Sequence, residues 1–455
     1  MTARSYNLFW FQATKWFVAI LLTILVATGA AVAQDPEAPP GGPPKVKLVP
    51  GPSGAITLSD VNQGDLRATI KGLVSCGTRH SLSSWTNPSR GIGCGRDHIV
   101  AEFKKIAQAS GGRLRVVVDR FEVKAPRTGN KTVPLENVYA ILPGDDPVLA
   151  KTVFVVSGHF DSRATDIMDS NSDAPGADDD GSGTAVSVEC ARLLARGRYR
   201  STLVFATVSG EEQGLLGGTR LLKYLEQQAY AVGGMLDDDI VGADSAPGPP
   251  HRVRLFSGGG KVDDCDSHSR ELARRVEEID GRHNIRLIFR LDRLGRGGDH
   301  IPFVRAGLPA VRFTEPLENY HHEHQTPRIE DGVEFGDRMK FLNFDFMARV
   351  ARDNAEALRE LAMAPAPPGS VALTGGVTPS AKVSWSAPTD AQRAGFEILW
   401  RETTNPRWSV YGFAKTSRDF VFEGVSTDNH FFAVRSVGKN GARSIAVPAV
   451  LRRRR

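Results

Sequence analysis

Residues 153–183 read VFVVSGHFDSRATDIMDSNSDAPGADDDGSG, and the rest of the chain is organised around them. The first four residues are apolar without interruption, which is typical of a strand buried on both faces. This strand leads directly to His159 and Asp161, and the acidic run Asp178–Asp180 follows in a Gly-rich turn. Ligand sites in open α/β sheets lie at the carboxyl ends of strands, so we expect these side chains to line such a crevice.

Strands alternate with helices on both sides of this stretch. Such alternation is typical of a mainly parallel sheet covered by helices, so the sequence predicts an α/β fold with a mainly parallel mixed sheet and helices on both faces. The predicted strands are 113–123, 137–142, 153–156, 203–208, 234–239, 253–256, 286–289 and 310–313; the predicted helices are 59–75, 96–109, 183–194, 217–230, 268–279, a short one from 300, and 337–363.

The composition changes at residues 364–369, APAPPG, which we interpret as a linker. Beyond it, residues 370–451 contain short alternating runs separated by polar turns, a pattern that predicts a small all-β sandwich, resembling a fibronectin type III module. No cluster of metal-binding or catalytic residue types occurs there, so we expect a packing module or one that attaches the protein to a surface or polymer. The chain ends in a basic tail, residues 452–455.

The N-terminus has the features of an export signal. Lys15 precedes an apolar run over 16–27, and Ala31-Val32-Ala33 supplies a small-residue cleavage pattern. The run is shorter than the roughly 20 residues that a spanning helix needs, so we predict a secretory signal peptide over 1–33 in preference to an uncleaved anchor. Residues 34–55 are rich in Pro and Gly and are predicted to form a disordered spacer. The mature protein is then secreted or periplasmic, without stable membrane insertion.

Composition limits the partners and the redox environment. The 455 residues carry 57 basic and 52 acidic side chains, a net charge of +5, which is too weak to indicate nucleic-acid binding. Of the four cysteines, Cys76 and Cys94 enclose a polar loop, and we predict a disulfide between them. Cys190 falls on the apolar face of a predicted helix and is expected to be a buried thiol, and Cys265 is unassigned.

Further chemistry-bearing side chains follow later predicted strands. Glu211 and Glu212 come after the strand that ends at residue 208, the run 237–239 ends another strand, and residues 320–325 read YHHEHQ. Histidine nitrogen and carboxylate oxygen are ligands that suit Zn²⁺. Five candidates can fill two sites if one carboxylate is shared, as in two-metal hydrolysis; they are His159, Asp179, Glu212, Asp239 and one late histidine.

On these motifs, residues 60–363 resemble the co-catalytic zinc exopeptidases of metallopeptidase family twenty-eight, typified by bacterial leucyl aminopeptidase and aminopeptidase Y. The motifs are His159-Phe-Asp161, Gly176-Ala-Asp-Asp-Asp-Gly-Ser-Gly183, Glu211-Glu-Gln-Gly214, Asp239-Ile-Val-Gly242 and the late histidines. The resemblance implies a di-zinc peptidase domain over 56–363, in which His159, Glu212 and Asp239 are terminal ligands and Asp179 bridges. It also implies that Glu211 is the general base and that Asp161 orients His159.

The last ligand rests on the resemblance alone. We predict His322, because Gln325 then falls where relatives can carry Gln, and we keep His324 as the alternative. Tyr320 is predicted to help hold the developing oxyanion. Asp299 and His300 occupy a Gly-rich loop and are read as support for the site rather than as ligands.

These residues predict an exported zinc-dependent aminopeptidase that removes N-terminal residues from a peptide or protein substrate with two zinc ions. Two alternatives share the fold: a carboxypeptidase and a glutaminyl-cyclase-like enzyme. A third is a non-catalytic peptide-binding or adhesion protein, which predicts a missing ligand or base. The five ligands and the base are present in the sequence.

Overall fold

The computed structural model of the protein describes residues 46–451, apart from 48–49, 52, 260–265 and 376–377. The predicted signal peptide, most of the predicted spacer, Cys265 and the basic tail lie outside the described residues. Within the described part, no helix combines the length and the apolar character needed to cross a membrane.

The main body is built on one eight-stranded sheet. Its strand order is β1-β2-β4-β3-β5-β8-β6-β7, and the pairs β4–β3, β3–β5, β5–β8 and β6–β7 are parallel while the other three are antiparallel. The prediction of a mainly parallel mixed sheet is confirmed. The bounds are β1 Arg115–Lys124, β2 Thr132–Leu142, β3 Thr152–His159, β4 Thr202–Val208, β5 Ala231–Asp238, β6 Val253–Phe256, β7 Ile285–Ile288 and β8 Ala310–Thr314.

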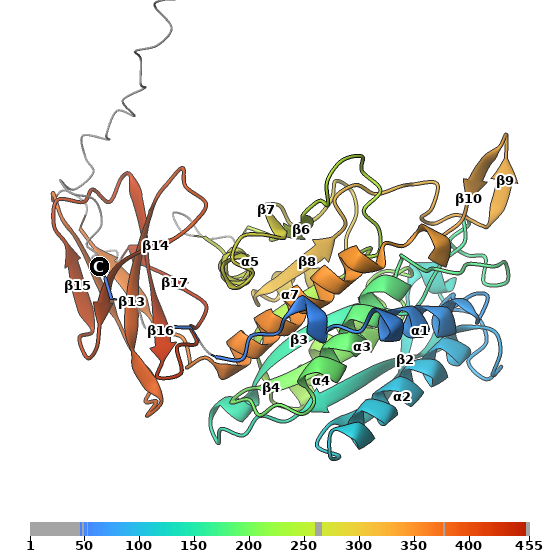
Figure 1. Cartoon of the computed structure of the whole chain (residues 1–455), viewed down its shortest axis with the longest axis horizontal. Helices are drawn as coiled ribbons and strands as arrows, with labels where there is room; N and C mark the ends of the chain where they lie inside the picture. The colour runs from blue at the N-terminus through green and yellow to red at the C-terminus, as the bar shows by residue number, and fades with distance from the viewer. Residues whose placement is uncertain (1–45, 48–49, 52, 260–265, 376–377, 452–455) are drawn as a thin grey trace, which may run out of the picture.

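Helices cover both faces of the sheet. On one face, α1, α2, α3, α5 and α7 contribute side chains to the larger apolar core, and Figure 1 shows α1, α2, α3 and α7 side by side over the strands. On the other face, α4 and α6 bury Leu221, Leu225 and Phe303 against β3, β4 and β5. The bounds are α1 Gln63–Val74, α2 Ile92–Ala109, α3 Gly181–Leu194, α4 Leu216–Gln227, α5 His268–Ile279, α6 His300–Arg305 and α7 Phe344–Met363.

The last helix begins later than the sequence predicts. The prediction starts it at Asp337, whereas α7 starts at Phe344, because the side chain of Asn343 accepts a hydrogen bond from the Phe346 N–H and caps the helix there. Asp337 lies in the preceding loop, where the short hairpin β9 (Arg328–Glu330) and β10 (Val333–Phe335) also falls. Its buried carboxylate faces the acidic run.

Two four-stranded sheets follow the linker and enclose a separate apolar core, which confirms the predicted sandwich architecture. One sheet has the order β15-β12-β11-β18 and the other β14-β13-β16-β17. The strands are β11 Val371–Thr374, β12 Ala381–Trp385, β13 Arg393–Glu402, β14 Ser409–Ala414, β15 Asp419–Phe422, β16 His430–Gly438, β17 Val447–Pro448 and β18 Val450–Leu451.

The sandwich packs against α5 of the main body. The Trp408 indole N–H donates to Glu271 at 2.6 Å, and Arg274 donates to the Pro406 carbonyl at 2.6 Å. Cys76 and Cys94 form the predicted disulfide, which joins the end of α1 to the first turn of α2, and Cys190 is a buried free thiol as predicted.

Candidate metal centre

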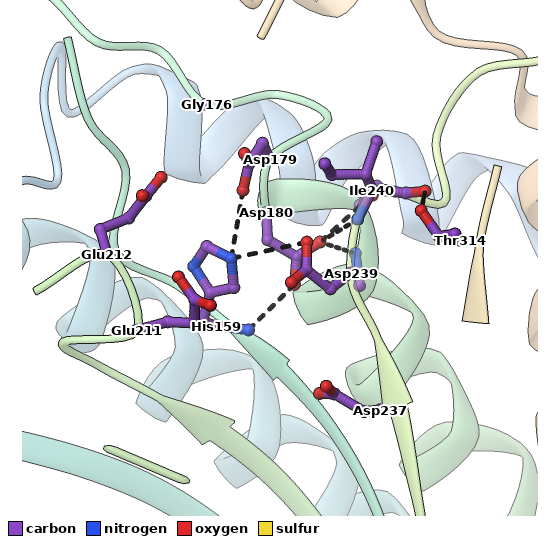
Figure 2. A network of polar contacts seen from close by, with 12 residues as sticks. His159, Gly176, Asp179, Asp180, Glu211, Glu212, Asp237, Asp239, Ile240 and Thr314 are labelled. Carbon is purple, nitrogen blue, oxygen red and sulfur yellow. Dashed lines mark hydrogen bonds and ion pairs between the residues drawn. The ribbon is translucent and has the colours of Figure 1, made fainter. Parts of the chain in front are cut away.

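Three neighbouring parallel strands bring the predicted ligands to one edge of the sheet. His159 is the last residue of β3, Glu211 and Glu212 follow β4, and Asp239 follows β5. Because β3 pairs with β4 on one side and with β5 on the other, these carboxyl ends meet in one crevice. Figure 2 shows the side chains converging there.

His159 lies at the centre of the group. Its Nε2 is 3.1 Å from Asp179 Oδ1 and 3.8 Å from Asp239 Oδ1. Its Nδ1 lies 3.1 Å from the carbonyl oxygen of Asp161, which fixes the plane of the ring. Burial alone would lower the pKa of His159, but Asp161, Asp179 and Asp239 outweigh it and raise this pKa well above its ordinary value.

The acidic run resolves into three carboxylates with different roles. Asp178 Oδ1 accepts a hydrogen bond from the Gly242 N–H at 2.7 Å. Asp180 caps α3, since its Oδ1 accepts from the Gly183 N–H at 2.8 Å. Asp180 Oδ2 also accepts from the backbone N–H of His159, but of the three acids only Asp179 contacts the imidazole rings of His159 and His324. Burial opposes its charge, but His324 and His159 outweigh that effect and hold the pKa of Asp179 well below its usual range.

Asp337 holds this turn in place. Its Oδ1 accepts from the Asp178 N–H at 2.8 Å, and its Oδ2 accepts from the Asp179 N–H at 2.7 Å. The sequence prediction placed Asp337 at the start of a helix and missed this role. An acid before an apolar periodic segment is the usual sign of a helix cap, so the local pattern contained no signal that could have found it.

His324, and not His322, reaches the cluster, which corrects the prediction. His324 Nε2 is 2.7 Å from Asp179 Oδ2 and 3.2 Å from Glu212 Oε1. His322 instead stacks on Phe341, with ring centroids 3.5 Å apart. The loop is irregular, and His324 has a φ of 51°, so alternation along an extended chain does not govern which way its side chains point. Burial lowers and the carboxylates of Glu212 and Asp179 raise the pKa of His324, to about 11.

The cluster divides into two groups that share one carboxylate. His159, Asp179 and Asp239 form the first, and Asp179, Glu212 and His324 form the second; within each group the candidate ligand atoms lie within 4.8 Å of one another. Imidazole nitrogen with carboxylate oxygen is a donor set that zinc accepts, and catalytic zinc sites commonly have three protein ligands and one open position. The residues therefore fit zinc.

Glu211 and Asp161 lie beside the cluster. The Asp161 carboxylate accepts from the backbone N–H groups of Glu211 at 3.3 Å and Glu212 at 3.2 Å, and from the Ser81 hydroxyl at 2.9 Å. It therefore fixes the loop that carries both glutamates. Burial, with the charges of Asp239 and Glu212 adding to it, raises the pKa of Glu211 well above its ordinary value, although His159 opposes the shift.

Arg312, on β8, is a site residue that the sequence prediction missed. Its side chain is fully buried, and Nη2 lies 2.9 Å from Asp239 Oδ1. An arginine inside the apolar strand AVRFT was the available signal, because a buried charge needs a partner. The predicted support residues lie behind the cluster: His300 Nδ1 is 3.2 Å from Asp237 Oδ2, and Asp299 Oδ1 accepts from the Gly218 N–H at 3.0 Å.

A pocket of about 880 Å³ opens over the cluster. Asp179, Glu211, Glu212, Asp239 and His324 form part of its wall, and Tyr320 lies at the rim with 66% of its surface exposed. A cavity of this size holds several residues of a peptide. Because residues of both ligand groups line the pocket, a substrate bound in the pocket contacts the cluster directly.

Known zinc metalloproteases resemble this chain in sequence. A model of peptidase family M28 matches residues 137–336. A probable zinc metalloprotease of Pyrenophora teres f. teres is 38% identical over 431 residues, which cover 88% of each chain. One from Leptosphaeria maculans is 39% identical over 413 residues, covering 86% of this chain and 95% of the relative.

Solved structures share the fold at lower identity. The aminopeptidase LapA of Legionella pneumophila superposes with a TM-score of 0.52 at 19% identity, over 68% of this chain and 73% of its own. A glutaminyl cyclase of Fimbriiglobus ruber superposes with a TM-score of 0.50 at 19% identity, over 70% and 97%. Given its match to the curated relatives over most of both chains, the protein belongs to peptidase family M28 and is a zinc metallopeptidase.

Proposed function

We propose that the protein is a two-zinc exopeptidase that hydrolyses N-terminal residues of peptides. The observation that carries the proposal is Asp179, whose two carboxylate oxygens face the two groups separately: Oδ1 faces His159 and Oδ2 faces His324. One ion would be held by His159, Asp179 and Asp239, and the other by Asp179, Glu212 and His324. When bound, the ions supply Lewis acidity toward the attacking water and the scissile carbonyl.

The residues of the chain carry the proton transfers. Glu211 lines the pocket and belongs to neither ligand group, so its carboxylate is free to take the proton of the attacking water and pass it to the leaving amine. Asp161 holds both the loop that carries Glu211 and the ring of His159 in position. The Tyr320 hydroxyl, at the rim, donates a hydrogen bond to the developing oxyanion.

The disulfide supports the proposal that the protein works outside the cytoplasm, after loss of a signal peptide over 1–33, because such bonds persist in oxidising compartments. The C-terminal sandwich is proposed to be of the fibronectin type III kind and to attach the enzyme to a surface or polymer. Its firm packing on α5 adds a structural role for it.

The test compares the wild type with Glu211→Gln and, as a matched control, Glu226→Gln on the exposed surface of α4. We expect Glu211→Gln to keep its zinc and to lose about 10²- to 10⁴-fold in kcat on aminoacyl substrates, while the control retains wild-type turnover. Undiminished turnover of Glu211→Gln contradicts the assignment of the base. Cleavage of N-blocked but not of free-amine peptides overturns the aminopeptidase assignment in favour of a carboxypeptidase. Conversion of an N-terminal Gln into a pyroglutamyl residue with release of ammonia, while the peptide bond stays intact, favours the cyclase.

A further inference from the structure

The wall of the pocket outside the metal cluster is rich in arginine. Apart from the cluster and Glu211, its charged lining residues are five arginines and one acid, Glu323. The arginines come from three separate segments of the chain, the loop after β1, the loop after β3 and residues 293–305. They are Arg127, Arg163, Arg293, Arg296 and Arg305.

Two of the five are already paired. Arg293 Nη1 lies 2.9 Å from Glu318 Oε2, and Arg296 contacts the same carboxylate. Arg296 also lies 3.5 Å from Glu323 Oε2. These two guanidinium groups therefore hold the loop together and offer little charge to a substrate.

The other three have no carboxylate partner outside the cluster among the residues that the structure describes. Arg127 donates only to the backbone carbonyl of Glu212, at 2.9 Å. Arg163 donates to two backbone carbonyls at 3.3 Å, and its Nη1 points toward the cluster, 3.9 Å from Glu212 Oε2. The side chain of Arg305 is exposed and makes no hydrogen bond or ion pair with a described residue.

Such groups are well suited to bind a carboxylate. A guanidinium presents its N–H donors in a planar fork that matches the two oxygens of a carboxylate, and a charge-assisted hydrogen bond gains strength where water is partly excluded. The side chain of Arg163 is 17% exposed, so this condition holds for it. Arg127 and Arg305 lie nearer the solvent and add attraction over a longer range.

We propose that Arg127, Arg163 and Arg305 form a subsite for a substrate carboxylate, so that the enzyme acts on anionic peptides; this deepens the proposed function and rests on it. The carboxylate comes either from an acidic side chain at the cleaved N-terminal residue or from the free C-terminus of a short peptide. Glu323 is the competing anchor, for a cationic group: it is 4% exposed, and its Oε1 accepts no hydrogen bond from a described residue.

The decisive experiment measures kcat/KM of the zinc-loaded full chain on isosteric pairs. One pair is glutamyl anilide and glutaminyl anilide; the other is Ala-Ala as the free acid and as the amide. We expect the anionic member of at least one pair to be favoured by about 10- to 100-fold, the effect of one to two charge-assisted hydrogen bonds. Preference in the first pair assigns the subsite to an acidic side chain, and preference in the second assigns it to the C-terminal carboxylate.

Variants tie the preference to the arginines. The measured quantity is the ratio of kcat/KM for the anionic substrate to kcat/KM for its neutral partner. Arg163→Met should reduce this ratio by about tenfold or more, and Arg305→Met by a few-fold. Arg163→Lys should retain part of the preference. Arg198→Met is the matched control, since that arginine is exposed on the surface and lines no part of this pocket. Turnover of the neutral substrate reports whether each variant is folded and loaded with metal.

Equal rates within both pairs, or a preference for lysyl over glutamyl anilide, would overturn the proposal. If no peptide is hydrolysed, the proposed function fails, and the subsite is tested separately by titrating glutarate into the zinc-loaded wild type and Arg163→Met. Weaker binding to the variant supports the subsite, and equal binding rejects it.

Discussion

Buried carboxylates gather in two regions of this molecule, and their partners differ. Where the sandwich meets α5, each has a fixed cation: Asp266 lies 2.8 Å from Arg401, and Glu271 lies 2.6 Å from Arg274. In the metal cluster, the acids face chiefly the imidazoles of His159 and His324, with Arg312 beside Asp239. Histidine can give a lone pair to a metal ion and arginine cannot. The partner, rather than burial, therefore distinguishes a structural carboxylate from a ligand.

The two regions also depend on their charges for different purposes. Removing one partner of a buried pair leaves the other charge uncompensated, and this lowers stability. Removing one ligand of a metal site costs affinity for the ion and the chemistry that depends on it. Substitutions in the metal cluster should therefore change activity with little effect on stability. Substitutions at the interface between the sandwich and α5 should change stability with little effect on activity.

The largest expected effect separates two adjacent acids. Asp179→Asn should lower kcat/KM by at least about 10³-fold and reduce bound zinc, because the shared carboxylate is lost. Asp178→Asn is the matched control, since an amide oxygen can still accept the hydrogen bond from Gly242, and it should cost less than tenfold. Metal analysis and kinetics on the same preparations decide; a greater loss in Asp178→Asn would reverse the assignment.

Of the two late histidines, only His324 should matter for activity and zinc binding. His324→Ala is expected to lower kcat/KM by about 10²-fold and to weaken the binding of one zinc ion. His322→Ala should keep activity within about threefold and lower the free energy of unfolding by about 1 kcal/mol, the contribution of its stacking on Phe341. Zinc stoichiometry by titration is the measurement, and loss of zinc in His322→Ala alone would restore the sequence prediction.

The interface should respond in stability. Arg274 contacts Asp266 and Glu271 and donates to the sandwich backbone at Pro406. Arg274→Met should lower the free energy of unfolding by about 3 kcal/mol, because it leaves buried carboxylates uncompensated, and should keep kcat/KM within about twofold. Urea unfolding monitored beside activity tests this, with the exposed Arg198→Met as control; an unchanged midpoint would show that the interface is weak.

The smallest effect is a change in pH dependence at the same interface. Burial raises the pKa of Glu271 to about 7, although Arg274 opposes it. The folded protein then holds the proton of Glu271 more tightly than the unfolded chain does. The resulting contribution to the free energy of unfolding is fully present below about pH 4.5 and is lost as the pH rises toward 7. Across this window the free energy of unfolding of Glu271→Gln should rise relative to that of the wild type by up to about 1.4 kcal/mol per pH unit. Parallel unfolding curves at pH 5 and 7.5 would contradict it.

Much of the site could be predicted because its signals are local. His159, Glu212 and Asp239 each stand at the end of an apolar run, and the ends of adjacent parallel strands meet. The errors and omissions fall in irregular loops or on distant partners. Asp337 accepts a hydrogen bond from the backbone of Asp179, which lies 158 positions earlier in the chain. Arg312 lies inside the apolar strand β8.

By itself, the sequence determined the α/β body, the C-terminal sandwich, the disulfide and the residue types that gather at the strand ends, because periodicity and composition are properties of short segments. The resemblance to a known family already pointed to Asp179 within its acidic run, and the tertiary structure shows this carboxylate facing both histidines. Only the tertiary structure decided that His324 closes the cluster in place of His322, and that arginines line the pocket. The reason is physical: in a loop without regular dihedral angles, the direction of a side chain is set by the groups packed against it, and those groups come from elsewhere in the chain.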